Sequence, residues 1–267
     1  MVKKKAFVKY VDNQNNHYLE DHSGRCDRES KCKYHLSPKG NNPITTNSYR
    51  EQPEHPTFHN ENVIQTYGNS YNNNHFIHFL AQYFTEDELI DVIKRYCIST
   101  STYWKGATIF WQIDEKLNIH AGKVMLYNIS TGKRIKKPFP HINWMHNVLQ
   151  MKDFVLQQCL FGLHNLEDHP VEKAICIVES EKTAIIMSIY YPNNLWLATG
   201  SKSNFKLELL KPLKQYNILA FPDKTEYENW NSKTQQLNKY GFNIKCSTYI
   251  ENLNVKEGVD LVDLVID

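Results

Sequence analysis

Apolar and polar positions follow two alternating periods along the C-terminal third of the chain. The short apolar runs AICIV, LWLA, NILAF and FNIKCSTYI are typical of strands. Between them, EKTAIIMSIYY and YENWNSKTQQLNKYG have helical spacing, and Gly241 ends the second helix. Strands that alternate with helices form a parallel sheet covered on both faces, so we expect an α/β domain over residues 171–267.

The middle of the chain, residues 75–170, has a mixed pattern. FIHFLAQYF and EDELIDVIKRYC have helical spacing, and Thr85 with Glu88 forms a capping-box pattern at the start of the second helix. TIFWQID and KVMLYNI are aromatic and β-branched runs that predict strands. VLQMKDFVLQQCLFGL is compatible with another helix. We therefore expect a mixed α+β subdomain before the parallel sheet.

The first 74 residues are poor in long apolar runs. Residues 1–40 are expected to form a small knuckle, because short strand-like runs precede closely spaced Cys and His. Residues 41–74 are rich in Asn, Pro, Thr and His, which predicts a linker or an extended strap on a neighbouring domain. The pattern thus predicts four parts: knuckle, linker, α+β subdomain and parallel-sheet domain.

The composition is that of a folded chain. Hydrophobic residues make up 41% of the 267 residues and charged residues 22%, so wholesale disorder is excluded. No stretch has the apolar length of a signal peptide or a membrane span, which predicts a soluble, cytoplasmic protein with no membrane partner. The net charge of +2 neither demands nor excludes a nucleic-acid partner, so local clusters must decide. The six scattered cysteines indicate metal ligands or core thiols.

Acidic side chains follow the predicted parallel strands where each strand ends. They are Glu179, Asp223, Asp260 and Asp263. The carboxyl ends of parallel strands share one edge, where ligands bind in open α/β sheets. Carboxylates that converge there suit Mg²⁺ or Mn²⁺ and phosphodiester chemistry. Lys182 would stand at the start of the following helix, within reach of a phosphate.

A plainer interpretation exists for each acidic residue taken alone. Glu179 and Glu181 could complement a helix N-terminus, and Asp223 could be a turn residue beside Pro222. Three such sites in the correct strand order favour the metal site.

AICIVESEKTAIIMS resembles the first strand, glutamate and helix of the Toprim domain of primases, topoisomerases and some nucleases. The blocks GRCDRESKCKYH, IFWQID, GKVMLYNISTGKRIKK and CLFGLH also resemble primase-like proteins from mobile elements of Bacteroidetes-type bacteria. The resemblance implies that Glu179 is a metal ligand or general acid/base and that Asp223 begins an Asp-x-Asp pair. The second position of that pair is Thr225, a departure that puts catalysis in doubt. Glu226 or Asp260 are candidate substitutes.

Cys26, Cys32 and His35 form a C-x5-C-x2-H knuckle. Thiolate and imidazole ligands at this spacing suit tetrahedral Zn²⁺, which needs a fourth ligand. Related primase-like proteins carry a Cys pair near the start, whereas MVKKKAF has none, so His17 or His22 are the remaining candidates. A metal-free knuckle with free thiols is the equally weighted alternative.

Basic residues gather in the middle segment around a predicted hairpin. They are Lys123, Lys133, Arg134, Lys136 and Lys137. Cations with nearby aromatic rings are the ingredients of a single-strand groove, although tryptophans more often pack a core and we interpret them so here. By analogy with a primase core, we interpret the basic cluster as a nucleic-acid contact.

The leading hypothesis is a primase-like, Mg²⁺-dependent nucleotidyltransferase acting on single-stranded DNA and nucleotides, with a replicative helicase as a candidate partner. Its catalytic set would be Glu179, Asp223, Asp260, Asp263 and Lys182. Three alternatives remain open: a catalytically decayed DNA-binding protein of a mobile element, a Toprim nuclease, and a protein that binds a small phosphorylated ligand.

Overall fold

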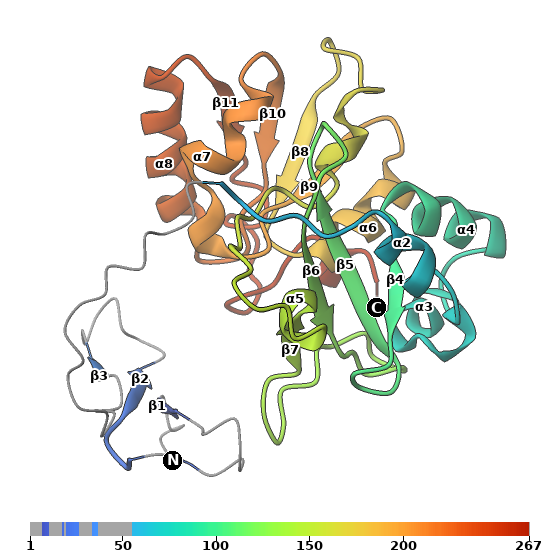
Figure 1. The fold of residues 1–267 in the computed structure, drawn as a ribbon. Helices are drawn as coiled ribbons and strands as arrows, with labels where there is room; N and C mark the ends of the chain where they lie inside the picture. The colour runs from blue at the N-terminus through green and yellow to red at the C-terminus, as the bar shows by residue number, and fades with distance from the viewer. Residues whose placement is uncertain (1–6, 11–17, 19, 27–33, 37–54, 267) are drawn as a thin grey trace. The chain divides into compact units, whose positions relative to one another are not determined.

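The computed structural model describes residues 7–10, 18, 20–26, 34–36 and 55–266. The chain forms two compact units, Met1–Gln52 and Pro53–Asp267 (Figure 1). The predicted linker, residues 41–74, spans the division between these units. Its described second half contains the helix α2, Asn62–Tyr67, and the short 3₁₀ helix η1, Tyr71–Asn73.

The first unit contains a small antiparallel sheet in its described part. Its strands, in spatial order, are β1, Phe7–Lys9, β2, Gly24–Cys26, and β3, His35–Leu36. Cys26 pairs with Phe7, and His35 pairs with Arg25, so two of the predicted zinc ligands stand on adjacent strands. Cys32 and the side chains of Cys26 and His35 lie outside the described residues, so the zinc site stays a prediction.

The second unit begins with an antiparallel sheet and the helices α3, His75–Leu80, and α4, Glu86–Arg95. The sheet strands, in spatial order, are β4, Ser99–Ser101, β5, Ala107–Ile113, β6, Ile119–Met125, and β7, Ile142–Trp144. Successive side chains of β5 point to opposite faces of the sheet. Trp111 therefore packs in one apolar cluster and Phe110 in another. Lys123 stands opposite Phe110 in the register.

The parallel sheet follows, as the sequence predicts. Its strands, in spatial order, are β11, Asn243–Cys246, β10, Asn217–Ala220, β8, Ile175–Val178, and β9, Leu195–Ala198. Helix α6, Glu181–Tyr190, covers the face that carries Cys176 and Val178. Helices α7, Leu207–Leu210, and α8, Tyr227–Lys239, cover the opposite face (Figure 1). The predicted α/β class, with helices on both faces of a parallel sheet, is confirmed.

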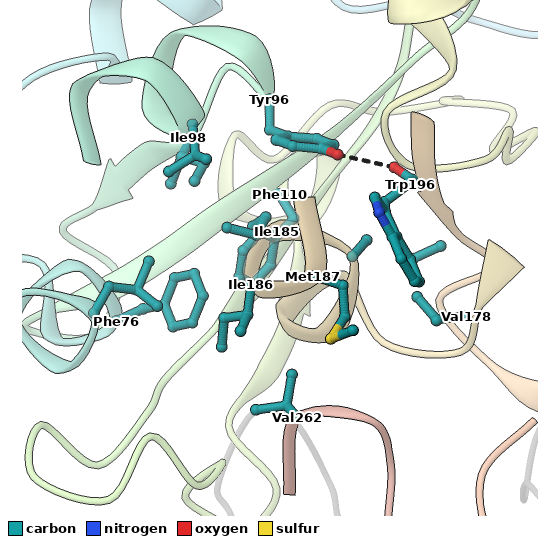
Figure 2. Close-up of a cluster of buried hydrophobic side chains, with 14 of the residues drawn as sticks. Phe76, Tyr96, Ile98, Phe110, Val178, Ile185, Ile186, Met187, Trp196 and Val262 are labelled. Atoms are coloured by element: carbon teal, nitrogen blue, oxygen red, sulfur yellow. Dashed lines mark hydrogen bonds between the residues drawn. The ribbon is translucent and has the colours of Figure 1, made fainter. Parts of the chain in front are cut away.

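One apolar core joins the two sheets of the second unit (Figure 2). Phe110 from β5 and Trp196 from β9 are both buried in it. The Tyr96 ring stacks on Phe161 at 5.2 Å, and the Tyr96 hydroxyl donates to the Trp196 carbonyl at 3.0 Å. Because the same side chains serve both sheets, the antiparallel and parallel parts fold as a single unit.

The helix suggested for VLQMKDFVLQQCLFGL is wrong. A short helix, α5, covers only Met145–Val148, and the chain then runs extended. Gln150 and Asp153 have left-handed φ values of 51° and 60°, which a continuous helix does not allow. The extended chain pairs instead with distant segments, since Phe161 exchanges backbone hydrogen bonds with Ala198. Tertiary pairing has overridden the local helical spacing.

The segment that precedes α2 lies along the antiparallel sheet. His59 forms an isolated antiparallel bridge with Ile119, and Thr57 bonds the backbone of Val155 at 3.1 Å. Within the described residues, no helix combines the length and the apolar character required to cross a bilayer.

Candidate active site at the edge of the parallel sheet

The predicted carboxylates follow the carboxyl ends of the parallel strands. Glu179 comes directly after β8, and Asp223 comes shortly after β10. The chain beyond β10 stays beside β8, because the Phe221 N–H donates to the Ile177 carbonyl at 2.8 Å. Asp260 precedes the 3₁₀ helix η5, Val262–Leu264, and Asp263 lies within it.

Asp223 lies within Coulombic reach of the other carboxylates. Burial raises its pKa to about 8, and nearby negative charges add to the shift. Those charges belong to Glu179, Asp260, Asp263 and Glu226. Asp223 therefore lies within electrostatic range of the other three carboxylates that the strand pattern selected and of Glu226. With a pKa of about 8, the Asp223 carboxyl tends to stay protonated at neutral pH, because burial disfavours its charged form and the neighbouring carboxylates add to that effect.

Glu179 has a more balanced environment. Burial raises its pKa, and the Glu226 carboxylate acts in the same direction. Lys202 opposes both effects, through its ammonium charge and through a backbone N–H, and Lys123 adds a weaker opposing charge. Lys202 also bonds Glu226 at 2.9 Å, so one lysine serves two of the clustered carboxylates.

Asp260 is held in place by two kinds of hydrogen bond. The Thr183 hydroxyl, on the first turn of α6, donates to Asp260 Oδ2. The Asp263 N–H donates to Asp260 Oδ1 at 3.0 Å, and the Asp260 N–H donates to Asp263 Oδ2 at 3.3 Å. These bonds fix the C-terminal turn against α6 and position its carboxylates beside Asp223.

Lys123 occupies a different place from the basic hairpin with which the sequence grouped it. Its ammonium is buried and donates to Glu181 Oε1 at 3.0 Å and to the Gly200 carbonyl at 2.9 Å. The grouping of Lys123 with the hairpin lysines is therefore wrong as a description of one exposed cluster. Sequence reasoning missed this pairing because its partners lie 58 and 77 positions away.

Two further residues complete the surroundings of Lys123. Gly200 has a left-handed φ of 73°, and a Cβ there would stand 3.0 Å from Glu181 Oε1, so both the backbone and the space favour glycine. Gln112 is buried beside Gly200, and neither of its amide atoms has a hydrogen-bond partner among the described residues. Nothing in the sequence marks Gln112, because a single polar residue in a strand is unusual only when the whole strand is buried, as β5 is.

Thr225 stands where the Asp-x-Asp pattern has its second carboxylate. Its φ is 78°, and its N–H donates to Glu251 Oε2 at 2.9 Å. The Lys224 ammonium bonds the carbonyls of Glu251 and Leu253 at 2.6 and 2.8 Å. These hydrogen bonds connect the loop to the C-terminal segment. Glu226, the next residue, is the nearby carboxylate whose charge raises the pKa of both Glu179 and Asp223.

The donor set of this edge fits a hard divalent cation. Its ligands are carboxylate oxygens, which Mg²⁺ and Mn²⁺ prefer, and the raised pKa of Asp223 reports an excess of buried negative charge. Among the described residues, however, no three acidic, His or Cys side chains lie close enough to share an ion. Binding at this edge would therefore require the carboxylates to rotate toward one another.

The remaining basic residues lie between β6 and β7. Lys133, Lys136 and Lys137 are exposed, and Arg134 is half-buried and pairs with Tyr127 through the backbone. Gly132 has a left-handed φ of 57°, and a Cβ there would collide with the Phe79 ring. The turn of the hairpin thus packs on α3 at Gly132, and the lysines on either side of Arg134 face solvent. Lys182, second in α6, is partly exposed.

Comparison of the sequence with protein families gives two matches. Residues 74–224 match the family described as Domain of unknown function (DUF6371), which covers more than half of the chain. The chain belongs to the DUF6371 family. Residues 1–46 match a family described as a zinc beta-ribbon finger, and this range includes the predicted knuckle. No curated protein matches the sequence.

The DUF6371 region covers only part of the acidic edge. It includes the antiparallel sheet, Lys123 and the strands that carry Glu179 and Asp223. It ends at Lys224, so Thr225, Glu226 and the Asp260 turn lie beyond the matched residues. The acidic edge of this DUF6371 member therefore combines matched and unmatched segments.

Several solved structures resemble this DUF6371 protein. The primase fragment of the bacteriophage T7 primase-helicase protein is 14% identical, with 94% of this chain and 92% of that chain covered and a TM-score of 0.47. The E. coli primase catalytic core is 11% identical, with 76% and 73% covered and a TM-score of 0.45. A DnaG primase catalytic domain bound to single-stranded DNA is 11% identical, with 76% and 74% covered and a TM-score of 0.46.

Proposed function

We propose that this protein is a primase-like nucleotidyltransferase that depends on Mg²⁺ or Mn²⁺ and acts on single-stranded DNA. The proposal depends mainly on one observation: Glu179 and Asp223 follow adjacent parallel strands at one edge of the sheet, and Asp260 and Asp263 lie within electrostatic range of Asp223. A folded protein keeps such mutually repelling, buried carboxylates at a cost to its stability, and a bound cation removes that cost. The family zinc-ribbon match and the sequence resemblance to Toprim proteins point in the same direction.

In this proposal Glu179, Asp223 and Asp260 hold the cation, and Asp263 keeps Asp260 oriented. A divalent cation bound there would neutralise phosphate charge and favour attack by a 3′ hydroxyl. The Lys202 ammonium offsets the negative charge of Glu179 and Glu226 at the edge of this site. The Lys182 ammonium and the exposed hairpin lysines would contact nucleotide or template phosphates.

An oligoribonucleotide synthesis assay tests the proposal. The full chain is incubated with nucleoside triphosphates, labelled single-stranded DNA, and Mg²⁺ or Mn²⁺. We expect primers with the wild type and none with Glu179→Gln. Asp87→Asn, a change at an exposed carboxylate in the first turn of α4, is the matched control and should keep full activity. Absence of product with every metal and template, or equal product from Glu179→Gln, would overturn the assignment.

A second candidate function is supported by Thr225, which leaves the Asp-x-Asp pair incomplete. Here the protein is a non-catalytic DNA-binding component of a mobile element. It would bind single-stranded DNA in a salt-sensitive way, and binding would survive Glu179→Gln unchanged. The same incubation also reveals the nuclease alternative, because only a nuclease shortens the labelled strand. A protein that binds only a small phosphorylated ligand would leave DNA mobility unchanged at low salt.

The zinc proposal concerns the first unit. We propose that Cys26, Cys32 and His35 bind Zn²⁺ there, with a fourth ligand from the same unit. The match of residues 1–46 to a zinc beta-ribbon family supports this. Zinc content, measured by elemental analysis of the full chain, should be close to stoichiometric in the wild type and lost in Cys32→Ser. Wild-type protein free of zinc would contradict it. A replicative helicase remains the proposed partner, to be tested by co-purification.

A further inference from the structure

Aromatic rings form a cluster beside the basic hairpin, on two loops of the antiparallel sheet. Tyr103 and Trp104 lie on the tight turn between β4 and β5, and Phe139 and His141 lie on the segment that enters β7. The ring centroids of Tyr103 and Trp104 are 4.7 Å apart, and those of Trp104 and His141 are 5.1 Å apart. Phe139 stacks on His141 at 4.5 Å and lies 6.5 Å from Trp104. We call these four rings the aromatic platform.

The platform leaves large ring faces in solvent. Tyr103 and Phe139 are each 50% exposed, whereas His141 is almost buried and Trp104 is half-buried. Trp104 and His141 therefore pack against Tyr103 and Phe139 and leave part of these two rings exposed. The expectation that the tryptophans of this segment pack a core holds for both residues, since Trp111 is fully buried and Trp104 packs against the same apolar cluster, but Trp104 also contacts the exposed rings.

Local backbone constraints limit the conformations of both loops that carry the platform. Gly106 has a left-handed φ of 84° and no room for a side chain, because a Cβ there would collide with His75. The Tyr103 N–H donates to the Ser101 hydroxyl at 3.1 Å, which closes the turn. Phe139 stands between Pro138 and Pro140, whose fixed φ angles limit the freedom of the loop. A preorganised ring loses little entropy when a partner stacks on it.

The charge of the two segments that carry the platform indicates the kind of partner that it would bind. The segments 92–113 and 116–152, which supply the whole platform, contain no Asp or Glu. They present three exposed lysines near the rings along the chain: Lys105 on the turn with Trp104, and Lys136 and Lys137 just before Pro138. A polyanion with flat, stackable groups satisfies both features, because phosphates pair with lysines and bases stack on rings.

We propose that the aromatic platform is a base-stacking site for single-stranded nucleic acid, with Tyr103 and Phe139 contacting bases and Lys105, Lys136 and Lys137 contacting phosphates. This deepens the proposed function, on which its biological meaning rests, by naming the residues that hold the strand. Stacking is indifferent to the identity of the base, so the site binds with little sequence preference. A duplex, whose bases are already stacked, binds only through the lysines.

The test is binding without catalysis. Fluorescence anisotropy of a labelled oligothymidylate is measured with the full chain in EDTA, so that no metal-dependent step contributes. We expect Tyr103→Ala and Phe139→Ala each to weaken binding about 5- to 100-fold without changing the slope of affinity against salt. Lys136→Gln together with Lys137→Gln should instead reduce that slope by about 1.4, since each phosphate contact on a single strand contributes about 0.7. Tyr240→Ala is the matched control, since Tyr240 is 63% exposed beyond α8, and it should bind as the wild type.

Conservative changes separate stacking from misfolding. Phe139→Trp should keep or strengthen binding, whereas Phe139→Leu should weaken it although both fill space. Oligouridylate and oligothymidylate distinguish an RNA from a DNA strand, and a labelled duplex should bind more weakly than either. Wild-type affinity in Tyr103→Ala and Phe139→Ala, or no binding of any single strand at low salt, would overturn the platform. Loss of primer synthesis in Glu179→Gln with intact binding would test the proposed function separately.

Discussion

The Lys123 ammonium lies 3.0 Å from Glu181 Oε1, and both side chains are buried. Lys123 belongs to β6 of the antiparallel sheet, and Glu181 opens α6 beside the parallel sheet. The Gly200 carbonyl, just after β9, accepts a further bond from the same ammonium. One cation therefore ties together three segments at the boundary between the sheets, next to the candidate active site.

Breaking this pair should destabilise the protein strongly. Lys123→Met leaves the Glu181 carboxylate buried and unpaired, which costs about 3–5 kcal/mol of unfolding free energy. Urea denaturation of the variant measures the loss. The double variant Lys123→Met with Glu181→Leu should recover much of it, because neither partner is then left charged. Asp91→Ala breaks the exposed pair with Arg95 and should cost less than about 1 kcal/mol. Similar losses from Lys123→Met and Asp91→Ala would contradict a buried ion pair.

Asp223 should make stability fall as pH rises. Its pKa is about 8 in the folded protein, against about 4 in an unfolded chain. Between these values the folded state retains a proton that the unfolded state has lost, so unfolding becomes easier from about pH 4 to pH 8. Asp223→Asn should remove that part of the pH dependence and raise stability at pH 8 by roughly 2 kcal/mol or more. Urea melts at pH 5 and pH 8 measure both effects, and parallel curves for the two proteins would refute the shift.

His59 should act in the opposite direction. It is buried against Trp111 and Phe154, neither ring nitrogen has a partner among the described residues, and burial together with His146 lowers its pKa to about 4. The unfolded chain takes up a proton near pH 6.5, so stability is full above that pH and declines as pH falls toward 4. His59→Phe keeps an aromatic ring and should flatten this decline. A wild-type slope in the variant, measured by urea melts, would mean that another group is responsible.

Thr85 should stabilise α4 by capping it. The Glu88 N–H donates to the Thr85 hydroxyl at 3.4 Å, and Glu88 Oε2 accepts from the Thr85 N–H at 2.8 Å. Thr85→Ala removes the first bond and should cost about 1 kcal/mol of stability, whereas Thr85→Ser should cost much less. Thermal unfolding followed by circular dichroism compares the two. Equal losses would show that the cap contributes through the methyl group and not through the hydroxyl.

The parallel sheet and the capping box of α4 could be predicted because their signals are local. Ile175 and Ile177 pack on one face of β8 while Cys176 and Val178 pack on the other, so an unbroken apolar run already identifies a strand covered on both sides. The order of strand ends also sufficed to select Glu179 and Asp223, because topology brings the ends of parallel strands to one edge.

The rest depended on contacts between distant segments. Lys123 has the same sequence signal as the hairpin lysines, and only the tertiary fold separates a buried cation from exposed ones. Trp104 and Trp111 likewise look alike in sequence, yet one supports an exposed cluster and the other is fully buried. The extended run after α5 escaped prediction because its partners, Thr57 and Ala198, lie far along the chain.

The backbone at Thr225 bears on how the acidic edge could change. A β-branched residue is poorly suited to a φ of 78°, whereas aspartate and asparagine accept the left-handed region more readily than other non-glycine residues. The loop therefore keeps a shape that favours a carboxylate while carrying a side chain that the shape disfavours. A single substitution, Thr225→Asp, would relieve local strain and place a second carboxylate two positions after Asp223, without any refolding of the loop.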